Sequence, residues 1–95
     1  MSDDGITLER GPTKGRYVLR IGADEAELTF SVANPALVIA DHTGVPDTMR
    51  GTGAGRRLVE RLVADARAEG FKLVPLCPFV KAQSLRHPEW ADVFA

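Results

Sequence analysis

Three glycines at alternate positions, Gly51, Gly53 and Gly55, separate two parts of the chain that have different hydrophobic periods. Before them, residues 25–32 alternate between polar and apolar types, as in a strand with one buried face. After them, apolar residues recur every three or four positions, as along one face of a helix: Leu58, Val59, Leu62, Val63 and Ala66. The glycine segment therefore joins a strand-rich part to a helix, which suits a layered fold of sheet and helices.

Short β-prone segments separated by turn residues fill the first 45 residues. We expect strands at residues 6–10, 17–21, 25–32 and 37–40. The last of these is a continuous apolar run, which predicts burial on both faces and a central place in the sheet.

The helix should end at Gly70, and residues 71–76 have the composition of a further strand. A strand, a helix and a strand in succession favour parallel pairing through a right-handed crossover. Helical spacing in residues 79–94 is interrupted by Pro88, so one or two short helices should follow.

These elements predict an α+β fold that resembles an α/β sandwich, as one domain over residues 1–95. Its sheet should be mixed and mostly antiparallel, with a central strand-loop-helix-strand unit and short C-terminal helices.

The composition excludes several classes of function. A formal net charge of -1 gives no reason to expect a nucleic acid partner. No run approaches the roughly 18 apolar residues that cross a bilayer, and residues 1–4 are acidic where a signal peptide is basic, so we expect a cytoplasmic protein without membrane contact. The single cysteine, Cys77, excludes an internal disulfide and an all-cysteine metal site, and we expect no metal. A core this small predicts a monomer or a weak dimer.

The glycine segment has a direct physical use. Glycines let the backbone approach a ligand closely, and the beginning of a helix presents unpaired amides to an anion. Arginines are concentrated around it at Arg50, Arg56, Arg57 and Arg61, with one acid among them. Phosphate is the natural ligand, although a tight strand-to-helix turn alone would also explain the glycines.

Two familiar phosphate motifs do not match the spacing. A P-loop requires a lysine after its last glycine, and none follows here. A dinucleotide fingerprint would place its third glycine at position 56, which is Arg56.

The segment Arg50-Gly51-Thr52-Gly53-Ala54-Gly55 resembles the Arg/Gln-x-x-Gly-x-Gly/Ala signature of the GNAT superfamily of acetyl-CoA-dependent N-acetyltransferases. The flanking segments, residues 41–46 (DHTGVP), 74–80 (VPLCPFV) and 87–90 (HPEW), are similar to those of minimal GNAT-like proteins of about this length. The resemblance covers nearly the whole chain. It implies a compact GNAT-like fold and a function as an N-acetyltransferase with acetyl-CoA as cosubstrate.

The resemblance also implies where the cofactor binds. In GNAT proteins the strand before the signature splays from the strand after the helix, and the pantetheine arm enters the gap. The implied cofactor-binding residues are Thr43, Val45, Arg50, Gly51, Thr52, Gly53, Ala54, Gly55, Arg56 and Arg57.

The catalytic residues are less determined, because the superfamily often uses a tyrosine as proton donor and the only tyrosine here, Tyr17, lies far upstream. His42 is a candidate base, since imidazole titrates near neutrality, although it would also serve to cap a strand. Cys77 is a candidate nucleophile beside the thioester, although free cysteines are often buried as small apolar residues.

The acceptor should be an amine. Full-length relatives place one or two helices between their first two strands, and residues 11–16 are too few for them. An uncovered site would suit a protein lysine, an N-terminus or a polyamine. Two alternatives stay open: a non-catalytic module that binds acetyl-CoA or CoA, and an α+β adaptor with an idle glycine turn.

Overall fold

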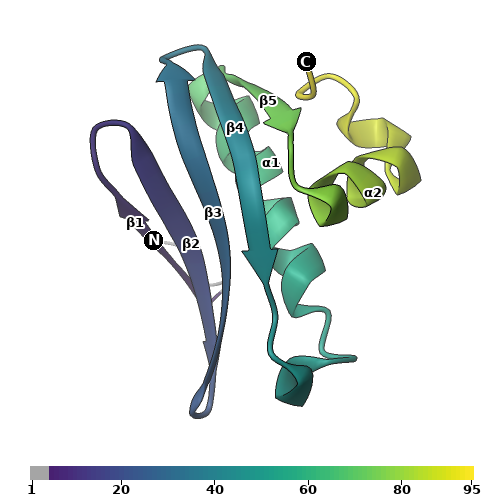
Figure 1. The fold of residues 1–95 in the computed structure, drawn as a ribbon. Coiled ribbons are helices and arrows are strands. Elements are labelled where there is room, and N and C mark those ends of the chain that lie inside the picture. Colours follow the sequence, from purple (N-terminus) through teal and green to yellow (C-terminus); the bar gives the residue numbers. More distant parts are fainter. Residues whose placement is uncertain (1–4) are drawn as a thin grey trace.

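The computed structural model describes residues 5–95 and shows a five-stranded sheet with two α-helices (Figure 1). The strands are β1 (Ile6–Arg10), β2 (Lys14–Ile21), β3 (Asp24–Asn34), β4 (Leu37–Gly44) and β5 (Lys72–Pro75). The helices are η1 (Asp47–Met49), α1 (Ala54–Glu69), α2 (Pro78–Arg86) and η2 (Pro88–Trp90), of which η1 and η2 are single 3-10 turns. The acidic Asp3 and Asp4 lie outside the described residues.

The sheet is mixed, with its strands in the order β1-β2-β3-β4-β5. The first four strands pair antiparallel, and β5 pairs parallel to β4 after the α1 crossover. The predicted α+β class, the mostly antiparallel sheet and the short C-terminal helices are confirmed. None of the helices in the described part is long and apolar enough to cross a membrane.

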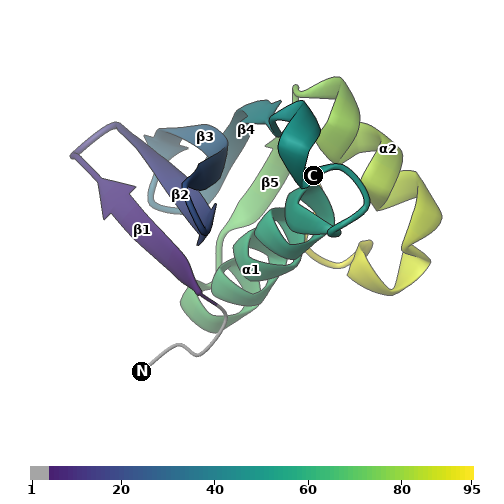
Figure 2. The same ribbon diagram turned by 90° about the horizontal axis from the view of Figure 1, so that it is seen from below.

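Helix α1 forms the core with one face of the sheet (Figure 2). The apolar positions predicted for this helix are all buried, and Ala26, Leu28 and Phe30 of β3 lie in the same core cluster. Gly70 ends the helix in a left-handed conformation with φ 79°, and its N–H donates to the carbonyl of Ala66 at 2.9 Å. This is the C-terminal stop that the sequence predicted.

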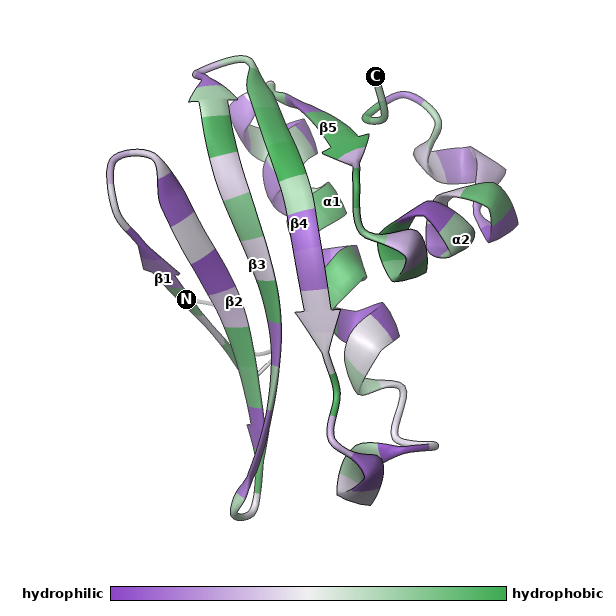
Figure 3. Cartoon of the chain, viewed as in Figure 1, coloured by the Kyte–Doolittle hydropathy of each residue, from purple (hydrophilic) through white to green (hydrophobic). Residues whose placement is uncertain are grey.

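Strand β4 differs from its prediction in three ways. It is the fourth strand of five, so β3 occupies the middle of the sheet. Leu37 and Ile39 are only half-buried, because α1 covers the sheet on the face opposite to them. The strand also continues past Ala40 to Gly44, and its character changes from apolar to polar along its length (Figure 3).

A β-bulge and the end of β5 open the sheet beside this polar half. In the pairing with β3, Thr29 lies opposite His42 and Phe30 opposite Ala40, so Asp41 is the extra residue of the bulge. Pairing with β5 ends where Ala40 meets Pro75. The N–H of Cys77 then donates to the Ala40 carbonyl at 2.9 Å, and the chain turns into α2. From residue 41 onward, β4 has lost its partner on the β5 side.

Candidate functional site

The glycine loop before α1 has a backbone that other residues would strain. Gly51 and Gly53 have φ values of 81° and 75°, in the left-handed region that favours glycine. The Thr52 hydroxyl donates to the Met49 carbonyl at 2.6 Å and accepts from the N–H of Ala54 at 3.2 Å. Thr52 therefore fixes the loop from within.

The first turn of α1 contains amides without a backbone acceptor. The N–H of Arg57 donates to the Gly53 carbonyl at 2.9 Å, which begins the helical ladder. Within residues 5–95, the amides of Gly55 and Arg56 have no backbone acceptor. The first turn also contains no acidic residue. An anion would satisfy these amides and the positive end of the helix dipole.

A cavity of about 370 Å³ lies against this loop. The segment after β4, η1, the glycine loop, the beginning of α1 and α2 all contribute to its lining. The lining residues are Val45, Met49, Arg50, Gly51, Gly53, Ala54, Gly55, Arg56, Phe79 and Gln83. Most of the predicted cofactor residues thus share one cavity, whereas Thr43, Thr52 and Arg57 are not among those that line it.

Helix α2 supplies a wall that the sequence analysis did not include. A Cβ atom at Gly55 would lie 2.7 Å from Cζ of Phe79, so the close approach of this ring depends on the glycine. Phe79 and Gln83 are four residues apart, on one side of α2. That spacing after Pro78, a favoured residue at the beginning of a helix, was the available signal.

Two arginines at the rim form exposed ion pairs. Arg50 lies 3.1 Å from Asp47, and Arg56 lies 3.6 Å from Glu60. Exposed pairs of this kind contribute about 0–1 kcal/mol, so either guanidinium can exchange its partner for a phosphate at little cost.

Thr43 and Cys77 contact each other just beyond the last residue pair of β4 and β5. Their Oγ1 and Sγ atoms lie 3.4 Å apart, and Cys77 is 4% exposed. Burial alone would raise the pKa of the Cys77 thiol, but hydrogen bonds to the sulfur outweigh this effect and hold the pKa below its ordinary value. The Thr43 hydroxyl has the largest lowering effect on this pKa, followed by the backbone of Val80, Phe79 and Thr43.

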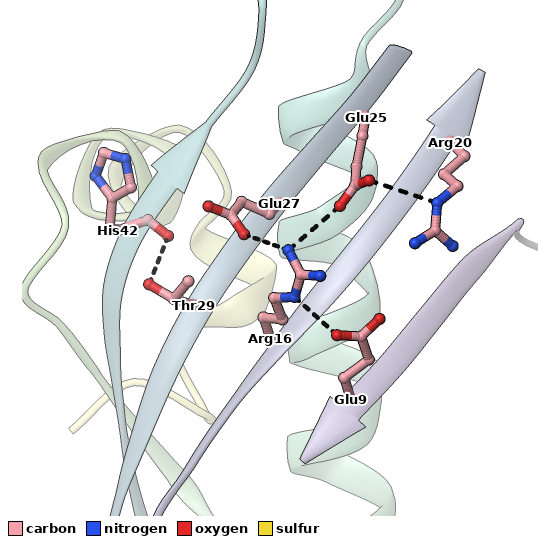
Figure 4. Close-up of polar contacts among 7 residues, drawn as sticks. All are labelled: Glu9, Arg16, Arg20, Glu25, Glu27, Thr29 and His42. Atoms are coloured by element: carbon pink, nitrogen blue, oxygen red, sulfur yellow. Dashed lines mark hydrogen bonds and ion pairs between the residues drawn. The ribbon is translucent and has the colours of Figure 1, made fainter. Parts of the chain in front are cut away.

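His42 lies on the other face of β4. It pairs with Thr29, whose hydroxyl donates to the His42 carbonyl at 3.4 Å, and its side chain is exposed (Figure 4). His42 and Cys77, the two candidate catalytic residues, therefore lie on opposite sides of β4.

An acidic cluster borders His42 on this outer face. Arg16 donates to Glu9 and to Glu27 at 2.8 Å and to Glu25 at 3.2 Å (Figure 4). Beside the cluster is a cavity of about 430 Å³, lined by Arg16, Glu25, Glu27, Gly44, Val45 and Pro46. Val45, the residue directly after β4, lines both this cavity and the loop cavity.

Comparison with known proteins agrees with this geometry. A family model described as GCN5-related N-acetyltransferase matches residues 16–93. The chain belongs to this family. Among curated proteins, none matches significantly. The chain is also similar to the solution structure of a GCN5-like protein from Staphylococcus aureus, itself a proposed N-acetyltransferase. The sequence identity is 26% and the TM-score 0.72, and the match covers 96% of this chain and 89% of the other.

The tyrosine of the chain lies in the core, away from the loop cavity. Tyr17 is 2% exposed on the α1 side of the sheet, and its hydroxyl donates to Oδ2 of Asp65 at 2.7 Å. Burial and this carboxylate raise its pKa well above the usual range. Its proton is therefore held by a carboxylate inside the core.

Other features of the fold lack the chemistry of the loop. A larger cavity of about 530 Å³ lies at the β1–β2 turn, bordered by Glu9, Lys14 and Asp41 among others, but no helix begins there. Among residues 5–95, no three His, Cys, Asp or Glu side chains gather as a metal site.

Proposed function

We propose that this GNAT protein is an acetyl-CoA-dependent N-acetyltransferase that transfers an acetyl group to an amine. The observation that carries the proposal is the loop cavity, because it joins the glycine signature and the beginning of α1 to the end of β4. The family match and the opening between β4 and β5 support the same function.

Acetyl-CoA supplies the activated acetyl group as a thioester, and the chain's own residues hold it. The amides at the beginning of α1 bind the diphosphate, with Arg50 and Arg56 as side-chain partners. Thr43 and Val45 line the acetyl end of the cofactor site, where β4 has no partner on its β5 side.

The acceptor approaches from the outer face. Glu25 and Glu27 give the cavity beside the Arg16 cluster an acidic border that attracts a cationic amine. The exposed His42 accepts the proton that the amine must lose before it attacks. Only residues 11–13 join β1 to β2, so no helix covers this face between those strands. We therefore propose a bulky acceptor such as a protein lysine, a protein N-terminus or a polyamine.

Cys77 provides a two-step route. Its sulfur forms a bond to the acetyl carbonyl carbon, the bond from that carbon to the sulfur of coenzyme A breaks, and the departing sulfur takes up a proton. The acceptor nitrogen then attacks the same carbon and releases the Cys77 thiolate. A direct transfer to the amine would leave Cys77 unmodified.

Intact-mass spectrometry separates the two routes. Protein mixed with acetyl-CoA and quenched rapidly should carry one acetyl adduct, and the Cys77→Ala variant should carry none. If no adduct that depends on Cys77 forms, the two-step route is wrong.

The test of the proposed function is release of free thiol from acetyl-CoA in the presence of different amines. We expect release that depends on the acceptor, fastest with proteins, peptides or polyamines. Binding of acetyl-CoA without any thiol release would instead support the non-catalytic module. A chain that does not bind acetyl-CoA would contradict both functions, and rapid acetylation of small amines alone would contradict the bulky acceptor.

A further inference from the structure

Gln83 is a buried polar residue whose side chain has no hydrogen-bond partner among residues 5–95. It is 8% exposed, the one polar side chain in the buried set of residues 5–95. Its carboxamide forms no hydrogen bond to another described residue. Its hydrogen-bond partner therefore comes from outside residues 5–95, as water or as a ligand.

The open side of Gln83 faces the loop cavity. Gln83 lines that cavity together with Phe79, one turn earlier on α2. In the described part of the chain, no fully sealed side-chain nitrogen or oxygen lacks a partner, so the carboxamide atoms stay open to water or a ligand. Because the residue as a whole is nearly covered, a ligand in the cavity is the partner best placed to reach them.

The chemistry of the lining indicates which part of a ligand Gln83 contacts. The negative charges of a diphosphate are matched by Arg50, Arg56 and the amides at the beginning of α1. Gln83 instead shares the cavity lining with four apolar residues, Val45, Met49, Ala54 and Phe79. A neutral carboxamide both donates and accepts hydrogen bonds, which complements another neutral amide.

We propose that Gln83 binds an amide of the pantetheine arm of coenzyme A. This inference rests on the proposed function, and it adds α2 as the second element that determines the position of the cofactor. The contact orients the arm after it leaves the diphosphate site, so that the thioester enters the gap beside Thr43 and Cys77.

Calorimetry with the Gln83→Met variant tests the contact, since methionine keeps the length of the side chain and removes both hydrogen-bonding groups. The titrants are acetyl-CoA, S-acetylpantetheine and adenosine 3′,5′-bisphosphate. Loss of one hydrogen bond of about 1 kcal/mol predicts affinity for acetyl-CoA about fivefold weaker. Affinity for the pantetheine fragment should fall in parallel, and affinity for the bisphosphate should not change.

Two further variants make the result specific. Ser84→Ala, which changes the next residue and removes only a local bond to the Lys81 carbonyl, should bind like the wild type. Gln83→Leu replaces Gln83→Met if thermal unfolding shows that the latter is misfolded. Unchanged affinity for acetyl-CoA, or a loss confined to the bisphosphate, would overturn the role of Gln83 alone. Failure of the wild type to bind acetyl-CoA would overturn the proposed function and this inference with it.

Discussion

At the scale of single residues, the loop glycines are required for two different reasons. Gly51 and Gly53 have positive φ, so any side chain there is strained even though neither has a neighbour within 4 Å of an added Cβ. Gly55 has ordinary helical geometry but lies against the Phe79 ring. The same residue type therefore protects the backbone shape at one position and the cavity wall at the other.

This difference predicts that alanine mainly lowers stability at position 53 and mainly weakens acetyl-CoA binding at position 55. Gly53→Ala should lower the free energy of unfolding by about 1–2 kcal/mol, because it forces a left-handed conformation on alanine. Gly55→Ala should change stability less, since alanine favours a helix and the partly exposed Phe79 ring can swing away. Its displaced ring should weaken acetyl-CoA binding about tenfold. Urea unfolding and calorimetry measure the two effects, and wild-type affinity of Gly55→Ala would contradict the role of Phe79 as a wall.

Cys77 gives a prediction about pH. Since its hydrogen bonds hold the thiol pKa below the ordinary value, the thiolate should form at lower pH than in a free cysteine. The rate of alkylation by iodoacetamide, followed against pH, should therefore reach half its maximum at lower pH than for a free cysteine.

Thr43→Val is the matched variant for this profile. It removes the hydroxyl 3.4 Å from the sulfur and keeps the shape of the side chain, so the midpoint should move to higher pH. A midpoint that is the same in both proteins would show that Thr43 does not stabilise the thiolate.

At the scale of elements, α1 is attached to the sheet by a polar link as well as by its apolar face. Tyr17 of β2 bonds to Asp65 of α1, and the Arg61 guanidinium carbon lies 5.6 Å from the centre of the Tyr17 ring. Arg61 also forms an ion pair with Asp65 at 3.2 Å. The link fixes how α1 lies on β2, and hence where the beginning of the helix presents its amides.

Tyr17→Phe should lower the free energy of unfolding by about 1–2 kcal/mol, because it removes a buried hydrogen bond to a charged group. Tyr17→Phe combined with Asp65→Asn should cost less than the sum of the two single changes, since each single change already removes the Tyr17–Asp65 bond and only the Arg61–Asp65 pair is left for the second change to weaken. Urea unfolding of the four proteins provides the cycle. Additive effects would contradict the link.

The elements also show how far sequence patterns reach. Helix α1 and strand β3 were predicted from their periods because each has a regular buried face. Helix α2 has only Val80 and Gln83 among its buried residues, too few to form a recognisable stripe, so its contribution to the cavity was missed. The contact between Thr43 and Cys77 depends on the bulge at Asp41, and no local pattern in the sequence reports a bulge.

At the scale of the whole molecule, the site lies where one strand loses its partner and two helices begin. Strand β4 loses its β5 partner, α1 begins after the glycine loop, and α2 begins at Pro78. The glycine spacing and its resemblance to the GNAT signature predicted the family. Which face of β4 carries His42 and which carries Thr43 was not predicted, because one extra residue in a strand changes the side of every residue after it.

The central claim is that acetyl-CoA binds along the beginning of α1 and the open edge of β4. Amide chemical shifts of the ¹⁵N-labelled protein during titration with acetyl-CoA test it most directly. We predict the largest changes at residues 52–56 and 41–45, with smaller changes in α2. Changes centred on the cavity at the β1–β2 turn, or no saturable changes at all, would contradict the account.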